Sequence, residues 1–202
     1  MDGDRATTGL LERNPWVTRR KFDVGEYYRL AEVGVLSEDD RVELIEGEII
    51  EMVPIGSDHS GTVNRLAYVL FRRVRDRAVV TVQNPLRLSD HTEPVPDFLL
   101  LRPRADFYQG APPPAADVLV LIEVAQSSLR YDRGVKLPLY ARHGVPEVWI
   151  VDLAGRVVEV HRGPGSEGYA SSTTHGPGHG PGDALEPTLL PGLCLSVADI
   201  LG

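Results

Sequence analysis

The chain lacks paired cysteines, long uncharged hydrophobic runs and an excess of positive charge, and each absence excludes a class of protein. Cys194 is the only cysteine, so neither an internal disulfide nor a multi-cysteine zinc site can form. No stretch approaches the roughly 18 apolar residues of a spanning helix, so we expect no membrane association. The first residues also lack a basic segment followed by an apolar one, the pattern of a signal peptide. We therefore expect a cytoplasmic protein.

The shortage of positive charge bears on nucleic-acid binding. The 21 Lys and Arg against 29 Asp and Glu give a net charge of −8. Neutralisation of phosphates supplies most non-specific affinity for nucleic acid, so the composition argues against binding through a broad basic surface. The densest basic group is Arg72, Arg73, Arg75 and Arg77. A solvated helix face is its simpler interpretation, and a local basic patch is the alternative.

The length and composition are those of one globular domain. The chain has 202 residues, of which 42% are hydrophobic and 25% are charged. Residues 1–22 are polar and predict a flexible N-terminal lead-in, which leaves 23–202 as a single domain. The segment 163–182 holds seven Gly and three Pro, which indicates a loop, although Tyr169–Thr174 could form a strand.

Hydrophobic periodicity predicts a mixture of helices and strands. Three- and four-residue spacing of apolar residues indicates helices over 23–32, 58–76 and 129–143. Apolar runs of strand length indicate strands at 42–53 (a hairpin about Glu46-Gly47), 78–82, 86–88, 95–101, 118–125, 147–153 and 156–162. Pro138 lacks an N–H, so we expect a kink in the third helix. We expect an apolar tail at 185–201 to pack back on the body. This order predicts an α/β or α+β domain, with helices packed on a mixed sheet.

Familiar catalytic motifs are also absent, and buried acids stand out instead. The chain has no GxxxxGK[ST], GxGxxG, HExxH or GxSxG motif. Glu43, Asp97 and Glu123 lie within apolar strand candidates. A buried carboxylate needs a partner, a raised pKa or a cation, and two carboxylates about 4 Å apart repel by roughly 4 kcal/mol at an effective dielectric near 20. A divalent ion such as Mg²⁺ removes that conflict. The alternative is that each acid faces solvent or pairs with an arginine.

A lysine follows these acids on the third predicted helix. Asp132, Lys136 and Tyr140 are four residues apart and share one helical face. The simpler interpretation is a local salt bridge worth a few tenths of a kcal/mol. The functional one is that Lys136 extends over the ends of the strands that carry Asp97 and Glu123, where it would orient or polarise a water molecule.

Several of these residues match a known pattern. Pro-Asp at 96–97 and Ile-Glu-Val at 122–124 resemble the PD-(D/E)XK nuclease superfamily. The longer pattern resembles the Uma family of bacterial restriction-endonuclease-like domains from about Phe22 to Leu201. It consists, in order, of RVELIEGEI, His59 at the start of a helix, PDFLLL, IEVAQSS, YDRGVKLPLY and HGVPEVWIVDL.

The resemblance implies a restriction-endonuclease-like mixed β-sheet core flanked by helices, with additional β-hairpins, and Mg²⁺- or Mn²⁺-dependent cleavage of DNA. Asp97, Glu123 and the backbone carbonyl of Val124 would hold the metal, with Glu43 as an additional acid. The lysine usual two residues after the glutamate is replaced by Ala125. The sequence is similar to variants in which that lysine lies on the following helix, so Lys136 is the candidate.

The resemblance also indicates supporting residues and partners. His59 could touch phosphate or metal, although a structural role is the simpler interpretation, and Gln83 could line the site. We interpret Ser127, Ser128 and Asp132 mainly as capping and supporting groups, and Tyr140 and Trp149 as core. The main hypothesis is a homodimeric metal-dependent endodeoxyribonuclease. The alternatives are a non-cleaving binding or scaffold protein, favoured by the net charge and Ala125, and a hydrolase of another phosphoester such as RNA or a nucleotide.

Overall fold

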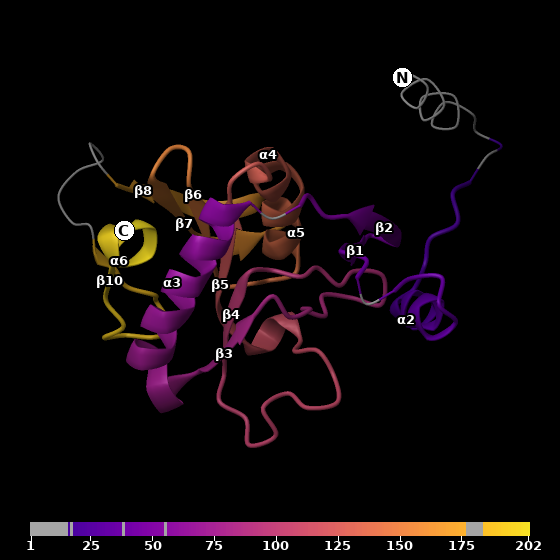
Figure 1. The fold of residues 1–202 in the computed structure, drawn as a ribbon, viewed down its shortest axis with the longest axis horizontal. Helices are drawn as coiled ribbons and strands as arrows, with labels where there is room; N and C mark the ends of the chain where they lie inside the picture. The colour runs from indigo at the N-terminus through magenta and orange to yellow at the C-terminus, as the bar shows by residue number, and fades with distance from the viewer. Residues whose placement is uncertain (1–15, 17, 38, 55, 177–183) are drawn as a thin grey trace.

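A six-stranded mixed sheet forms the centre of the molecule (Figure 1). The computed structural model describes residues 16, 18–37, 39–54, 56–176 and 184–202. The sheet has the order β3-β4-β5-β6-β7-β8. Its strands are β3 (Val79–Val82), β4 (Phe98–Leu101), β5 (Val118–Ala125), β6 (Glu147–Asp152), β7 (Val157–Gly165) and β8 (Gly168–His175). The predicted mixed sheet with flanking helices and small hairpins is confirmed.

One parallel pair at the centre of the sheet shapes the chain path. β5 and β6 are parallel, and every other neighbouring pair in this sheet is antiparallel. A parallel pair needs a crossover connection. It is supplied here by α4 (Leu129–Tyr131), a π-helical turn (Asp132–Lys136) and α5 (Leu137–Arg142). The crossover therefore begins where β5 ends, next to the predicted acids.

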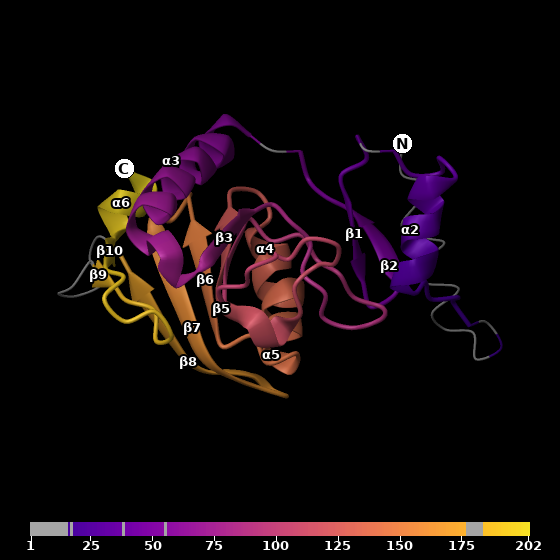
Figure 2. The same cartoon turned by 90° about the horizontal axis from the view of Figure 1, so that it is seen from below.

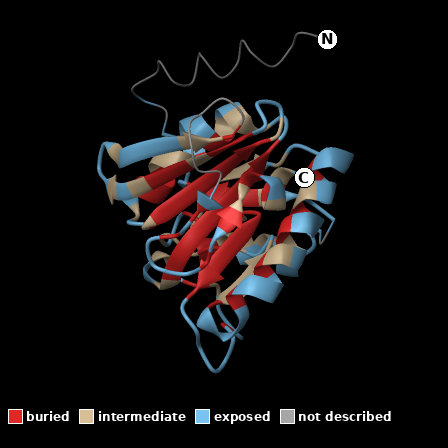
Figure 3. Cartoon of the chain, turned by 90° about the vertical axis from the view of Figure 1, so that its left-hand side faces the viewer, coloured by how far each residue is buried: buried red, intermediate tan, exposed pale blue. Residues whose placement is uncertain are grey.

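Side chains that alternate along β5 build a separate core on each face of the sheet. Ile122 and Val124 pack against α3 (Ser57–Val74) and α6 (Val197–Leu201) on one face of the sheet. Leu121 and Ala125 lie on the other face, which α5 covers. Figure 2 shows the sheet between α3 on one face and α4 and α5 on the other. Figure 3 shows that the central strands are buried, whereas the outward face of α3 is exposed. Glu123 lies between Ile122 and Val124 in sequence and so faces α5.

Two small elements lie to one side of the sheet (Figures 1 and 2). They are α2 (Val24–Glu32) and the hairpin of β1 (Val42–Ile45) and β2 (Glu48–Glu51). The hairpin turns at Glu46 and Gly47, which have φ values of 48° and 78°, so glycine relieves strain at the second position. The Glu93 N–H donates to the Leu44 carbonyl, which ties the hairpin to the body.

The predicted kink before Pro138 takes the form of a π-helical turn. Because Pro138 has no N–H, the carbonyl of Gly134 cannot receive its usual helical bond. The Leu137 N–H instead donates to the Asp132 carbonyl, five residues back. The extra residue in this turn leaves both Asp132 and Lys136 buried.

Several predicted boundaries were wrong. Leu86–Leu88 makes only an isolated bridge at Arg87, and β4 begins at Phe98 rather than at residue 95. The expected loop at 163–182 begins as a hairpin, because Pro164 pairs with Tyr169 and extends the β7–β8 ladder. Phe71, assigned to the apolar stripe of its helix, is 56% exposed.

The C-terminal end of the chain packs on the body, whereas most of the N-terminal end is not described. Most of the predicted lead-in at 1–22 and part of the glycine-rich segment lie outside the described residues. The apolar tail packs against α3 as expected, through β9 (Ala184–Leu185), β10 (Leu195–Ser196) and α6. Single 3₁₀ turns occupy Arg75–Arg77 and Ala115–Asp117. None of the described helices is long and apolar enough to cross a membrane.

Candidate active site

A cavity of about 420 Å³ opens beside the carboxyl end of β5. The segment that follows β2 forms one wall, and the first turns of the crossover helix form the other. The predicted residues that line it are His59, Gln83, Asp97, Glu123, Val124, Ser127, Ser128, Asp132 and Lys136. The fold therefore gathers side chains from α3, β5, the crossover and the segment between β3 and β4.

Asp97 lies at the start of β4, where the register brings it opposite Glu123. Phe98 pairs with Ile122 across the antiparallel β4–β5 ladder, and Asp97 is one position earlier. Its side chain turns toward the strand end, because the Val124 N–H donates to it at 2.8 Å.

Two further side chains hold the Asp97 carboxylate. Gln83 donates its amide N–H at 3.1 Å, and Nε2 of His59 lies 3.1 Å from Oδ1. Burial acts to raise the pKa of Asp97, but the contacts with His59, Val124 and Gln83 outweigh it and lower that pKa. Asp97 is therefore a buried carboxylate that stays ionised.

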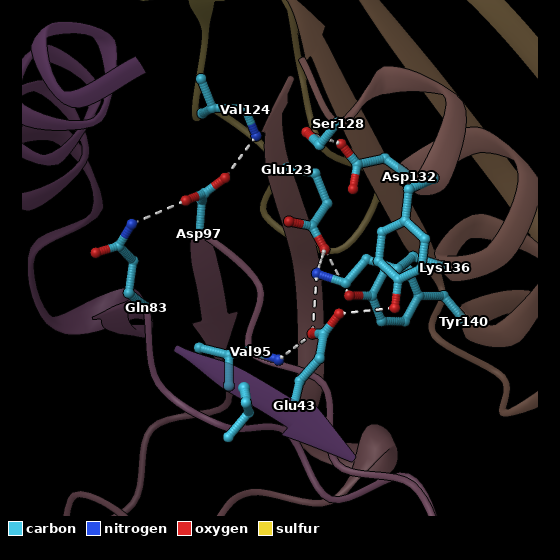
Figure 4. A network of polar contacts seen from close by, with 12 residues as sticks. Glu43, Gln83, Val95, Asp97, Glu123, Val124, Ser128, Asp132, Lys136 and Tyr140 are labelled. Carbon is cyan, nitrogen blue, oxygen red and sulfur yellow. Dashed lines mark hydrogen bonds and ion pairs between the residues drawn. The ribbon is translucent and has the colours of Figure 1, made fainter. Parts of the chain in front are cut away.

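Lys136 lies between two buried glutamates. Its Nζ is 3.0 Å from Oε1 of Glu123 and 3.3 Å from Oε2 of Glu43 (Figure 4). Tyr140 donates its hydroxyl to Glu123 at 2.6 Å, and Tyr131 donates to Glu43 at 2.9 Å. The amine is thus fixed in place from both sides.

Burial and neighbouring charges shift the pKa values of this group. Burial raises the pKa of Glu123, and the nearby charges of Asp132 and Asp97 raise it further against the opposing effect of Lys136. Burial acts to lower the pKa of Lys136, but Glu123, Glu43 and Asp132 outweigh it and raise that pKa. The amine therefore stays protonated. Burial and the charges of Asp132 and Asp97 raise the pKa of Glu123 to about 8, so this carboxyl is largely protonated near neutral pH when no further cation lies beside it.

Asp132 is a further buried acid beside this group. Ser128 donates its hydroxyl to Asp132 at 2.6 Å. Burial raises the pKa of Asp132, although the bond from Ser128 opposes the shift. Ser127 is exposed at the cavity wall. Ser128 is the N-cap of α4, but its side chain makes no capping hydrogen bond there, and the supporting roles of Ser128 and Asp132 stay a prediction.

The predicted ligands do not all meet at one point. Among the residues that the structure describes, no three His, Cys, Asp or Glu side chains converge closely enough to hold an ion. Glu43 makes its contacts with Lys136, Tyr131 and the Val95 N–H instead of lining the cavity.

Sequence reasoning missed three residues. Tyr131 and Tyr140 were not assigned to the site, yet both donate to its glutamates. The four-residue spacing of Tyr140 from Lys136 was the available signal. Arg41, at the rim of the cavity, opens the RVELIEGEI motif two positions before Glu43, and that proximity was the available signal.

We predict that Tyr140→Phe destabilises the fold without unfolding it. The hydroxyl is fully buried and donates to a buried carboxylate, so its loss should lower the free energy of unfolding by about 1.5–3 kcal/mol. Urea denaturation measures the change. Tyr68→Phe is the matched control, because Tyr68 is exposed and should change stability by less than about 0.5 kcal/mol. Equal effects of the two variants would contradict the prediction.

Comparisons with known proteins agree with this fold. The model of the Uma2 family, described as "Putative restriction endonuclease", matches residues 24–198. A solved structure, described as "a putative nuclease belonging to DUF820" from Anabaena variabilis, superposes with a TM-score of 0.65. The two chains are 19% identical, and the match covers 89% of this chain and 97% of the other. No curated protein matches the chain.

Proposed function

The chain belongs to the Uma2 family, and from this premise and the geometry of the cavity we propose that it is a Mg²⁺- or Mn²⁺-dependent endonuclease that hydrolyses DNA phosphodiester bonds. The observation that carries the proposal is the gathering of four buried acids around one buried lysine, with the pKa of Glu123 raised to about 8 by burial and by its acidic neighbours. Glu43, Asp97, Glu123 and Asp132 are each at most 8% exposed, and Lys136 is the buried cation among them. Acids buried this close together are costly to ionise at the same time unless a cation offsets their charge.

The donor set supports a hard divalent cation. Asp97, the second carboxylate oxygen of Glu123 and the Val124 carbonyl would hold it, and all three supply oxygen, the donor that Mg²⁺ prefers. The N–H and C=O of one strand residue leave the strand on the same edge. Because the Val124 N–H donates to Asp97, the Val124 carbonyl belongs to that edge too. When bound there, the ion supplies an acidified water and offsets charge on the phosphate.

Lys136 and Glu43 have separate tasks in this proposal. The protonated amine, beside Glu123, offsets negative charge that builds on the phosphate. Glu43, first expected as an additional ligand, holds the amine in position. Hydrolysis adds the water oxygen to phosphorus and breaks one P–O bond, and a proton of that water ends on the leaving oxygen.

Two specific observations favour the non-cleaving alternative. The usual lysine position holds Ala125, and Lys136 is already engaged by two carboxylates. A hydrolase of RNA or of a nucleotide would use the same residues and differ only in substrate. For cutting both strands of a duplex, the family resemblance favours a homodimer, which sedimentation of the purified protein would detect.

Cleavage of supercoiled plasmid DNA tests the proposal. We expect wild-type protein to nick the plasmid in Mn²⁺ or Mg²⁺ but not in EDTA, and Asp97→Asn to lose this activity. Asp106→Asn is the matched control, because Asp106 is exposed and pairs only with Arg104 and the Tyr108 N–H, away from the cavity. Equal activity in all three proteins would indicate a contaminant, and no activity in any of them would favour the scaffold alternative.

A further inference from the structure

The acidic residues lie deep in the cavity. The side chains of Asp97, Glu123 and Lys136 are 11%, 5% and 6% exposed, respectively. A phosphodiester must approach these groups closely to be cut. In a continuous duplex each phosphate is flanked by stacked base pairs, and the helix is stiff over about 150 base pairs. A continuous duplex therefore brings its phosphate to these groups less readily than an unpaired nucleotide, which fits a cavity of about 420 Å³.

The walls of the cavity are largely apolar, whereas its floor is acidic. Apolar side chains gather along and after β2 and at the approach to β4, namely Ile50, Met52, Val53, Pro54 and Val95. Tyr131 lines the cavity from the crossover helix. Apolar and aromatic side chains are the surfaces between which enzymes hold a nucleobase that has left the stack.

The rim has one arginine suited to a phosphate. Arg41 lines the cavity at the open end of the hairpin, where its carbonyl accepts the Met52 N–H. Its exposed guanidinium makes no hydrogen bond or ion pair with the described part of the chain. Glu51 also lies at this rim, where its charge repels phosphates. A single strand has few phosphates nearby and can keep them away from Glu51, so this residue favours a single strand over a duplex. An unpaired guanidinium is a ready donor for a backbone phosphate.

We propose that the cavity takes one unpaired nucleotide, so that the substrate is single-stranded or locally unpaired DNA rather than a continuous duplex. This inference rests on the proposed nuclease function of the same site. The acidic floor receives the scissile phosphate, the apolar wall receives the base, and Arg41 binds a neighbouring phosphate. Supercoiled plasmid fits this scheme because negative supercoiling opens short unpaired segments.

Three end-labelled DNAs of one sequence test the inference in Mn²⁺: a single strand, a matched duplex, and a duplex with a central unpaired bubble. We expect the single strand and the bubble to be cut at least about tenfold faster than the duplex, because the cost of unpairing is avoided. The cuts in the bubble substrate should map to the unpaired segment. Equal rates on the duplex and the single strand would overturn the inference and leave the nuclease proposal standing.

Matched variants assign the effect to the cavity. Arg41→Ala should raise KM for the single strand about tenfold with little change in kcat, because it removes a contact made equally in ground and transition states. Arg130→Ala removes an exposed arginine outside the cavity and should change neither. Val53→Glu should weaken single-strand binding, whereas Val35→Glu, also at an exposed valine, should not. If Arg41→Ala and Val53→Glu both bind the single strand as tightly as the wild type, the inference is overturned.

If the wild-type protein cuts none of the three DNAs, the nuclease proposal is contradicted. DNA binding then tests the preference for unpaired DNA separately. Fluorescence anisotropy of the labelled single strand and duplex, each with Mn²⁺, is the readout. Preferential binding of the single strand that Arg41→Ala abolishes would support the inference for a non-cleaving protein. Equal binding of both DNAs would overturn it.

Discussion

Replacing Lys136 with methionine is expected to lower the free energy of unfolding by about 3–5 kcal/mol, because the change leaves two buried glutamates without their shared cation. Methionine keeps most of the side-chain volume, so the loss reports charge rather than packing. Urea denaturation measures it. Lys21→Met is the matched control: its amine lies 2.6 Å from Glu48, but both side chains are more than 40% exposed. Such a surface pair contributes only about 0–1 kcal/mol.

A compensating variant separates charge from shape. Adding Glu43→Gln and Glu123→Gln to Lys136→Met removes both orphaned charges and should restore much of the lost stability. If Lys136→Met were as stable as the wild type, the amine would not be neutralising this cluster, and our description of its electrostatics would be wrong.

Glu123→Gln is expected to lower the cleavage rate by about 10²–10³-fold while the metal-free protein keeps or gains stability. The glutamine is nearly isosteric with the protonated carboxyl, the form that a pKa of about 8 favours at neutral pH in the metal-free protein. It also removes a ligand oxygen from the proposed metal site. Cleavage of single-stranded DNA in Mn²⁺ and urea denaturation in EDTA measure the two effects.

Glu147→Gln gives the matched control on the same sheet. Glu147 is also buried, but it accepts hydrogen bonds from Trp149, Arg162 and the Thr188 N–H, so its charge is fully engaged. We expect this variant to lose stability and keep cleavage, the reverse of Glu123→Gln. The same pattern in both variants would mean that Glu123 has only a structural role.

Much of the candidate site could be predicted because its residues lie in strongly patterned segments. Asp97 and Glu123 each stand beside a run of apolar residues, and such runs form central strands. Asp97 lies at the start of one strand and Glu123 within the neighbouring strand. Burying a carboxylate at such a position costs enough free energy to indicate a function. Lys136 followed from the helical pattern, although the π-helical turn that orients it was foreseen only as a kink at Pro138.

The remaining features depend on contacts between distant segments. Arg41 reaches the cavity only because the hairpin docks on the body through Leu44 and Glu93, which no local pattern encodes. A strand at Tyr169–Thr174 was allowed for, but the extension of the β7–β8 hairpin through 163–168 was missed because glycine and proline suggest a loop, whereas pairing along an edge strand tolerates both. In each case tertiary contacts override local propensity.

Calorimetric titration of Mn²⁺ into the metal-free protein tests the central claim most directly, namely that the buried acids of the cavity form a divalent-cation site. We predict a single ion bound per chain, with affinity at least about tenfold weaker in Asp97→Asn and in Glu123→Gln and unchanged in Glu147→Gln. Absence of binding heat in the wild type, or undiminished binding in the Asp97 and Glu123 variants, would contradict the claim.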